Sequence, residues 1–62
     1  MPQFHSHLVE ALARAGWEQN RRNAEECYGH IVGAPWEDET DQLRGFWRKT
    51  AIAMLEEFYR NE

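Results

Sequence analysis

The feature that most constrains this chain is where its turn-forming residues fall. Among 62 residues, glycine and proline gather mainly in one short stretch, Gly29 to Pro35, and such residues interrupt regular structure. The stretches on either side carry apolar residues at helical spacing, whereas two-residue alternation is confined to a few residues around Ile31. The sequence therefore predicts one small all-α domain over residues 1–62. We expect a helical hairpin with helices at about residues 6–30 and 39–59.

The start of the first helix follows from its capping and charge pattern. Ser6 is a suitable N-cap, since its hydroxyl can accept a hydrogen bond from a backbone N–H one turn later. Glu10 precedes Arg14 by four residues, and Glu18 precedes Arg22 by four. Pairs in this order stabilise a helix by a few tenths of a kcal/mol. We therefore expect both ion pairs to form within the helix.

Gly16 interrupts the pattern of the first helix. Glycine costs about 1 kcal/mol in a helix interior, so this position marks a break, a kink, or a close approach by an aromatic ring such as Trp47. The residues on both sides are compatible with helix, which favours one continuous helix. A short separate helix ahead of Trp17 is the alternative.

Acidic residues mark the start of the second helix. Asp38 or Thr40 can cap it, and Glu39 and Asp41 then meet the positive end of the helix dipole. The apolar residues that follow lie at the spacing of a core-facing helix. From the stripes on both helices we predict six core anchors: Trp17, Tyr28, Leu43, Trp47, Met54 and Phe58.

The second helix carries more apolar surface than one neighbour can cover. Packing against one helix buries a stripe slightly wider than about 100°, and Ile52, Leu55 and Tyr59 fall outside that stripe. Either a second copy covers them in a homodimer, or the first turns fold back through a bend at Gly16 to give a three-helix monomer. Trp36 follows a proline in the loop; we favour a lid over the core, with a binding hot spot as the alternative. The candidate interaction surface comprises Trp36, Ile52, Leu55 and Tyr59.

Charge and cysteine content limit the partners and the compartment. The formal net charge is −4, whereas affinity for nucleic acid or anionic lipid needs clustered cations. The alternative, a nucleic-acid-binding helical module, would use five basic residues: Arg21, Arg22, Arg44, Arg48 and Lys49. With one cysteine, no secretory leader and no run of 18 apolar residues, we expect a cytoplasmic protein outside the membrane.

Cys27 and His30 have spacing compatible with a metal site, and His5 and His7 could supply two further ligands for zinc. We favour ordinary surface histidines and a semi-buried thiol, because His5 and His7 do not share one helix face. A zinc-stapled mini-domain stays the less favoured alternative. No nucleophile motif or phosphate loop is present, and so small a chain has little room for an internal pocket. We therefore expect no catalytic, cofactor-binding or metal residues, and not an enzyme.

The order of aromatic and charged residues over about residues 9–58 supports a resemblance. Trp17, Pro35-Trp36 with its acids, and then Trp47-Arg48 and Ala51 resemble small helical proteins of bacteriophages and bacteria with a proline-aromatic-acidic loop. The chain is also faintly similar to the ryanodine-receptor repeat, although it lacks that repeat's Gly-Trp-x-Tyr-Gly segment. The resemblance implies a helical accessory or phage-type protein. We expect a self-associating protein–protein interaction module that forms a homodimer and can bind another, unidentified protein.

Overall fold

Two long helices joined by a loop make up the fold. The structure is a computed structural model and describes residues 4–60. Helix α1 spans Ser6–Tyr28, a 3₁₀ turn η1 spans Trp36–Asp38, and helix α2 spans Asp41–Arg60. The described residues contain no strand. The predicted all-α helical hairpin is confirmed, with α1 ending two residues earlier than expected.

Local hydrogen bonds set the helix ends. The ring Nδ1 of His5 accepts a hydrogen bond from the His7 N–H at 3.1 Å, so His5 is the N-cap of α1. The prediction that Ser6 caps α1 is wrong, because Ser6 is already the first helical residue. Gly29 ends α1 in the left-handed conformation, with φ 80°, which glycine adopts without strain. At α2, the Thr40 hydroxyl accepts from the Leu43 N–H at 3.2 Å, as one of the two predicted caps requires.

Helix α1 runs unbroken through Gly16. A Cβ atom at this position would lie 3.0 Å from Cζ3 of Trp47, so Gly16 lets the indole ring approach the helix backbone. The favoured continuous helix is confirmed, and of the three readings offered for Gly16 the close approach by Trp47 is the one that holds. The three-helix alternative is wrong, because α1 has no break at Gly16 and stays one helix.

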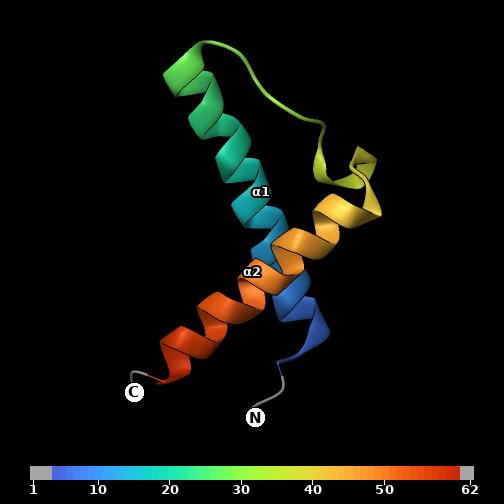
Figure 1. Cartoon of the computed structure of the whole chain (residues 1–62), viewed down its shortest axis with the longest axis vertical. Helices are drawn as coiled ribbons and strands as arrows, with labels where there is room; N and C mark the ends of the chain where they lie inside the picture. The colour runs from blue at the N-terminus through green and yellow to red at the C-terminus, as the bar shows by residue number, and fades with distance from the viewer. Residues whose placement is uncertain (1–3, 61–62) are drawn as a thin grey trace.

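The two helices cross rather than lie side by side along their length (Figure 1). The last turns of α1 extend away from α2, and the loop returns from there to the region where α2 begins (Figure 1). The Cα trace measures 40 × 24 × 15 Å, with a radius of gyration of 12.9 Å. A compact chain of this length has a radius of gyration of about 10.6 Å. The fold is therefore a thin slab rather than a sphere.

The buried core lies around the helix crossing. Two alanines, Ala13 and Ala51, are fully buried in it, and small residues at a crossing let helix axes come close together. The other buried members of this cluster are Val9, Trp17, Trp36 and Leu55, with Phe4, Leu12, Leu43 and Trp47 packed against them. Among the predicted core anchors, Trp17 is buried, and Leu43 and Trp47 are partly buried against the cluster.

The other three predicted core anchors are wrong. Tyr28 is 73% exposed, because it lies in the last turn of α1, which extends beyond α2 (Figure 1). Met54 and Phe58 are 47% and 63% exposed. They are exposed because α2 meets the core through Ala51 and Leu55, a face rotated by one helical position from the predicted stripe.

Candidate interaction surface

Trp36 is the most deeply buried aromatic residue among residues 4–60, with 2% of its surface exposed. Two glutamates of α1 hold it in place. Its backbone N–H donates to Oε2 of Glu18 at 2.9 Å, and its indole Nε1–H donates to Oε1 of Glu10 at 3.1 Å. A buried indole needs such a polar partner for its N–H. The lid that we favoured for Trp36 is confirmed, and the alternative of an exposed hot spot is wrong.

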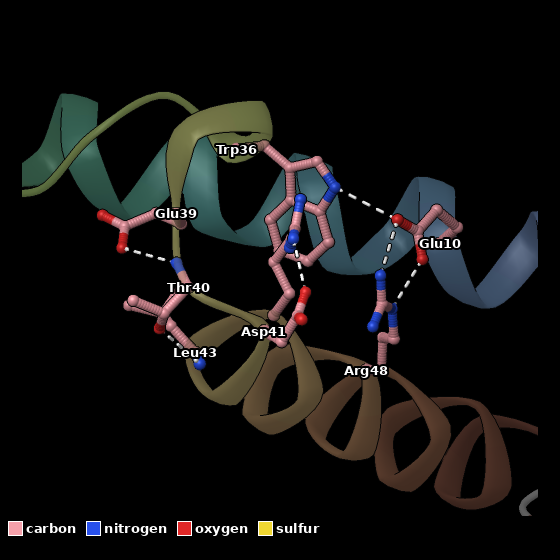
Figure 2. Close-up of polar contacts among 8 residues, drawn as sticks. Glu10, Trp36, Glu39, Thr40, Asp41, Leu43 and Arg48 are labelled. Atoms are coloured by element: carbon pink, nitrogen blue, oxygen red, sulfur yellow. Dashed lines mark hydrogen bonds and ion pairs between the residues drawn. The ribbon is translucent and has the colours of Figure 1, made fainter.

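Glu10 also joins α1 to α2. Its carboxylate accepts hydrogen bonds from Nε of Arg48 at 2.7 Å and from Nη2 at 3.1 Å (Figure 2). The Arg48 guanidinium also lies 5.8 Å from the centre of the Trp36 ring, within reach of a cation–π interaction. The hydrogen bond from Arg48 lowers the pKa of the Glu10 carboxyl, against the opposing effect of desolvation. The hydrogen bond from the Trp36 N–H likewise lowers the pKa of Glu18.

The loop before Trp36 is held on the same side of α1. The indole Nε1–H of Trp17 donates to the Ala34 carbonyl at 2.8 Å, and the Ala34 N–H donates to Oε2 of Glu39 at 2.7 Å. Gly33 has φ 74°, and a Cβ there would lie 2.5 Å from the Trp17 ring. Only glycine therefore fits between the loop backbone and this indole.

Two glutamates of α1, Glu10 and Glu18, bind Trp36 rather than the arginines four residues after them. The two predicted i,i+4 ion pairs are wrong, because Glu10 and Glu18 turn toward Trp36. Arg14 pairs instead with Glu37 of η1, and Arg21 pairs with Glu18 from three residues away. Of the acids expected at the start of α2, only Asp41 lies in its first turn.

One flank of α2 is apolar and exposed. Phe46, Met54 and Phe58 follow one another at spacings of eight and four residues and are 63%, 47% and 63% exposed. Beside Phe46 an open groove of about 430 Å³ runs between α1 and α2, lined by Trp17, Asn20, Thr40, Gln42, Leu43, Phe46 and Trp47. The groove is open to solvent along its length rather than enclosed. We expected little room for a pocket inside so small a chain. This groove lies at the surface and does not enclose a ligand.

The predicted interaction surface divides into exposed and buried residues. Ile52 and Tyr59 are exposed, and Tyr59 stacks on Phe4 with ring centroids 5.7 Å apart. Trp36 and Leu55, with 2% and 8% exposure, lie in the core and form no part of a surface. For these two residues the prediction is wrong, because α2 turns Leu55 toward α1 and the glutamates of α1 hold Trp36 inward.

Sequence reasoning missed two features of the site, the exposed flank and the anchoring role of Glu10 and Glu18. Glu10 is 26 residues from Trp36 and 38 from Arg48, so no local spacing connects them. A signal was present for the flank, because the apolar residues of α2 were seen to exceed one stripe. That signal did not specify which of them stay exposed.

Most of the basic residues proposed for nucleic acid are engaged with carboxylates. Arg21 pairs with Glu18, Arg44 with Asp41 and Arg48 with Glu10. Arg22 and Lys49 form no ion pair within the described chain. The basic residues therefore present a surface of mixed sign rather than a cationic stripe.

The four residues considered for zinc lie at opposite ends of α1. His5 and His7 are at its start, with ring centroids 5.0 Å apart, and Cys27 and His30 are at its end. Cys27 is exposed rather than semi-buried as expected. Within residues 4–60, no three His, Cys, Asp or Glu side chains are grouped closely enough to hold a metal ion.

Neither α1 nor α2 combines the length and the apolar character needed to cross a membrane, as far as residues 4–60 are concerned. Comparison with protein-family models, with curated proteins and with solved structures gives no significant match.

Proposed function

We propose that this protein is a small helical protein–protein interaction module whose first partner is a second copy of itself, acting as an accessory factor. The observation that carries the proposal is the exposed apolar flank of α2, where Phe46, Met54 and Phe58 are 63%, 47% and 63% exposed.

The character of the exposed surface supports the same proposal. Three large apolar side chains on α2, at positions 46, 54 and 58, are about half exposed or more. A cluster of exposed apolar side chains is typical of interaction sites. Burying each of them would contribute roughly 1.5–3 kcal/mol before entropy is subtracted, which is large for a small domain.

The charged residues with displaced pKa values also support a binding role. Glu10, Glu18 and Arg48 are the described residues whose pKa values are displaced, and displaced pKa values can mark catalytic sites. Here each of these groups contacts Trp36 or bridges the helices. Their displaced pKa values therefore have a structural cause, which favours a binding protein over an enzyme.

Sedimentation equilibrium of the full chain, from micromolar to near-millimolar concentration, tests the proposal. We expect a reversible increase in mass from 7.4 kDa to twice that value. A monomer mass across the whole range would defeat self-association. Titrating the tryptophan fluorescence with duplex DNA at about 0.15 M salt tests the alternative function. We expect no saturable change, and salt-sensitive binding would favour the nucleic-acid module instead.

A further inference from the structure

The N-cap of α1 is a titratable side chain. The ring Nδ1 of His5 accepts a hydrogen bond from the His7 N–H at 3.1 Å. The carbonyl of His5 accepts from the N–H groups of Leu8 and Val9 at 3.0 and 3.1 Å, so the hydrogen bonds of the first turn begin at this residue. The N-cap of α2 is instead the hydroxyl of Thr40, which keeps its proton at any pH where proteins fold.

An imidazole can serve as this cap only while it is neutral. Nδ1 of His5 accepts through its lone pair, so the ring proton lies on Nε2. In the protonated ring both nitrogens carry hydrogen and both are donors, and two N–H groups would then face each other. The cap and the protonated ring therefore exclude each other. Histidine is the side chain that changes charge between about pH 5 and pH 8.

The start of α1 offers no compensation for a positive charge. The N-terminus of a helix is the positive end of its dipole, and the first turn of α1 contains no acidic residue. The His7 ring lies 5.0 Å from the His5 ring, between centroids, so a second proton there adds repulsion. Glu10, the first carboxylate along α1, already accepts two hydrogen bonds from Arg48 and one from Trp36.

The end of α2 offers none either. The turn that packs against the start of α1 contains Tyr59, and the charged residues beside it are Glu56, Glu57 and Arg60. Glu57 and Arg60 pair with each other. No ion pair among residues 4–60 involves a histidine. Protonation of His5 is therefore not offset by a carboxylate of the other helix.

The residue before the cap joins α1 to the end of α2. The Phe4 ring stacks on the Tyr59 ring, with centroids 5.7 Å apart and an interplanar angle of 23°, and Phe4 also packs against the core cluster. The start of α1 and the end of α2 lie on the same side of the helix crossing (Figure 1). Because Phe4 adjoins His5, release of the cap also frees the segment that holds this ring against α2.

We propose that His5 is a pH-sensitive cap whose protonation opens the first turn of α1 and lifts Phe4 off Tyr59. The open turn takes up a proton that the capped turn excludes, so lowering the pH from about 8 to about 5 favours the open turn. An N-cap typically shifts such an equilibrium about fivefold. Opening uncovers Tyr59 beside the exposed Ile52 and so enlarges the apolar surface of α2. The inference does not depend on self-association.

Nuclear magnetic resonance of the full chain at about pH 8 and about pH 5, a range above that of carboxyl groups, tests the proposal. The nuclear Overhauser contact between the Phe4 and Tyr59 rings reports the closed turn. The protection factor of the Val9 amide, which donates to the His5 carbonyl, reports the same turn. We expect the contact to weaken and this protection factor to fall about fivefold at the lower pH. The Arg44 amide, which donates to the Thr40 carbonyl, is the internal reference and should keep its protection.

Four variants identify the titrating group. His5→Asn keeps an acceptor at the cap without an imidazole, so its first turn should stay closed at both pH values. His5→Ala has no acceptor and should show the open turn at both. His30→Gln removes an exposed imidazole of the loop, whose Nδ1 contacts the Tyr28 carbonyl, and should respond to pH like the parent. His7→Gln keeps the cap and should also respond to pH.

Three results would overturn the inference. The first is a parent protein whose Phe4–Tyr59 contact and Val9 protection are the same at both pH values. The second is an equal loss of protection at Arg44, which would mean that the whole fold opens rather than one turn. The third is a pH response that persists in His5→Asn or disappears in His7→Gln or His30→Gln, because the titrating group would then lie outside the cap.

Discussion

Gly16 of α1 and Trp47 of α2 are in direct contact: a Cβ added to Gly16 would lie 3.0 Å from Cζ3 and 3.1 Å from Cε3 of the indole. The missing Cβ of Gly16 leaves the space that the Trp47 ring occupies against α1. Gly45 of α2 offers a matched comparison, because a Cβ there would meet nothing within 4 Å. Both glycines lie inside helices, so they share the same propensity cost.

Alanine at these two positions should therefore act in opposite directions. Gly45→Ala should raise the free energy of unfolding by about 0.8–1.0 kcal/mol through helix propensity. Gly16→Ala gains the same amount but must displace the indole, and overpacking costs about 1–3 kcal/mol. We expect a net loss of about 1 kcal/mol in urea titrations followed by circular dichroism. Equal stabilisation by both variants would show that the indole moves away without cost.

Trp36 should be the most sensitive aromatic residue of the fold. Trp36→Ala removes a side chain with only 2% of its surface exposed and should cost about 3–5 kcal/mol, most of the stability of a small domain. Trp36→Phe keeps a buried ring and loses the Nε1–H donated to Glu10, so a smaller loss of about 1 kcal/mol is expected. Trp47→Ala, at a partly exposed position, should cost less than Trp36→Ala. A larger loss for Trp47→Ala than for Trp36→Ala in urea titrations would contradict the role of Trp36 as a lid over the core.

Adjacent residues of α2 should differ sharply on truncation. Leu55 is 8% exposed and Met54 47% exposed. Leu55→Ala should lower the free energy of unfolding by about 2–4 kcal/mol. Met54→Ala should cost less than about 1 kcal/mol when measured at a concentration where the chain is monomeric. Similar losses for both variants would mean that Met54 also packs against α1, as the apolar periodicity of α2 predicted.

Local signals in the sequence account for much of this fold. The glycine and proline residues between positions 29 and 35 separate the helices, and Thr40 caps α2. Glycine at position 16 leaves room for the indole of Trp47 beside the helix backbone. These features depend on residues a few positions apart, or on the intrinsic cost of glycine in a helix. They could therefore be predicted without knowledge of the tertiary structure.

The orientation of α2 could not be predicted in the same way. Its apolar residues cover more than half of its circumference, so periodicity alone does not choose between a face centred on Trp47 and one centred on Leu55. The crossing of the helices at buried alanines makes that choice, and it leaves Phe46, Met54 and Phe58 outside. The contacts of Glu10 also depend on this crossing, because Trp36 lies 26 positions and Arg48 lies 38 positions from Glu10 in the sequence.

The contacts of Glu10 lead to a prediction about acid stability. Its folded-state pKa is lowered, chiefly by the hydrogen bond from Arg48, so its pKa in the unfolded chain is the higher of the two. The stabilisation is therefore fully present above the unfolded value of about 4.3. It is lost as the pH falls through the lower folded value. Glu18, whose pKa the Trp36 N–H lowers, adds an effect of the same sign.

Thermal unfolding of the parent and of Glu10→Gln, followed by circular dichroism between neutral pH and about pH 3, isolates the contribution of Glu10. At neutral pH we expect Glu10→Gln to have the lower melting temperature, because its neutral amide loses the charge-assisted bond with Arg48. The difference should shrink as the pH falls below about 4.3, where the Glu10 carboxyl of the unfolded chain becomes protonated, and should be lost as the pH falls through the lower folded-state pKa. Glu26→Gln, at an exposed position of α1 with no ion pair within residues 4–60, is the control and should melt like the parent at every pH. A constant difference between the parent and Glu10→Gln down to the lowest pH would mean that Glu10 stabilises the fold through packing and not through its charge.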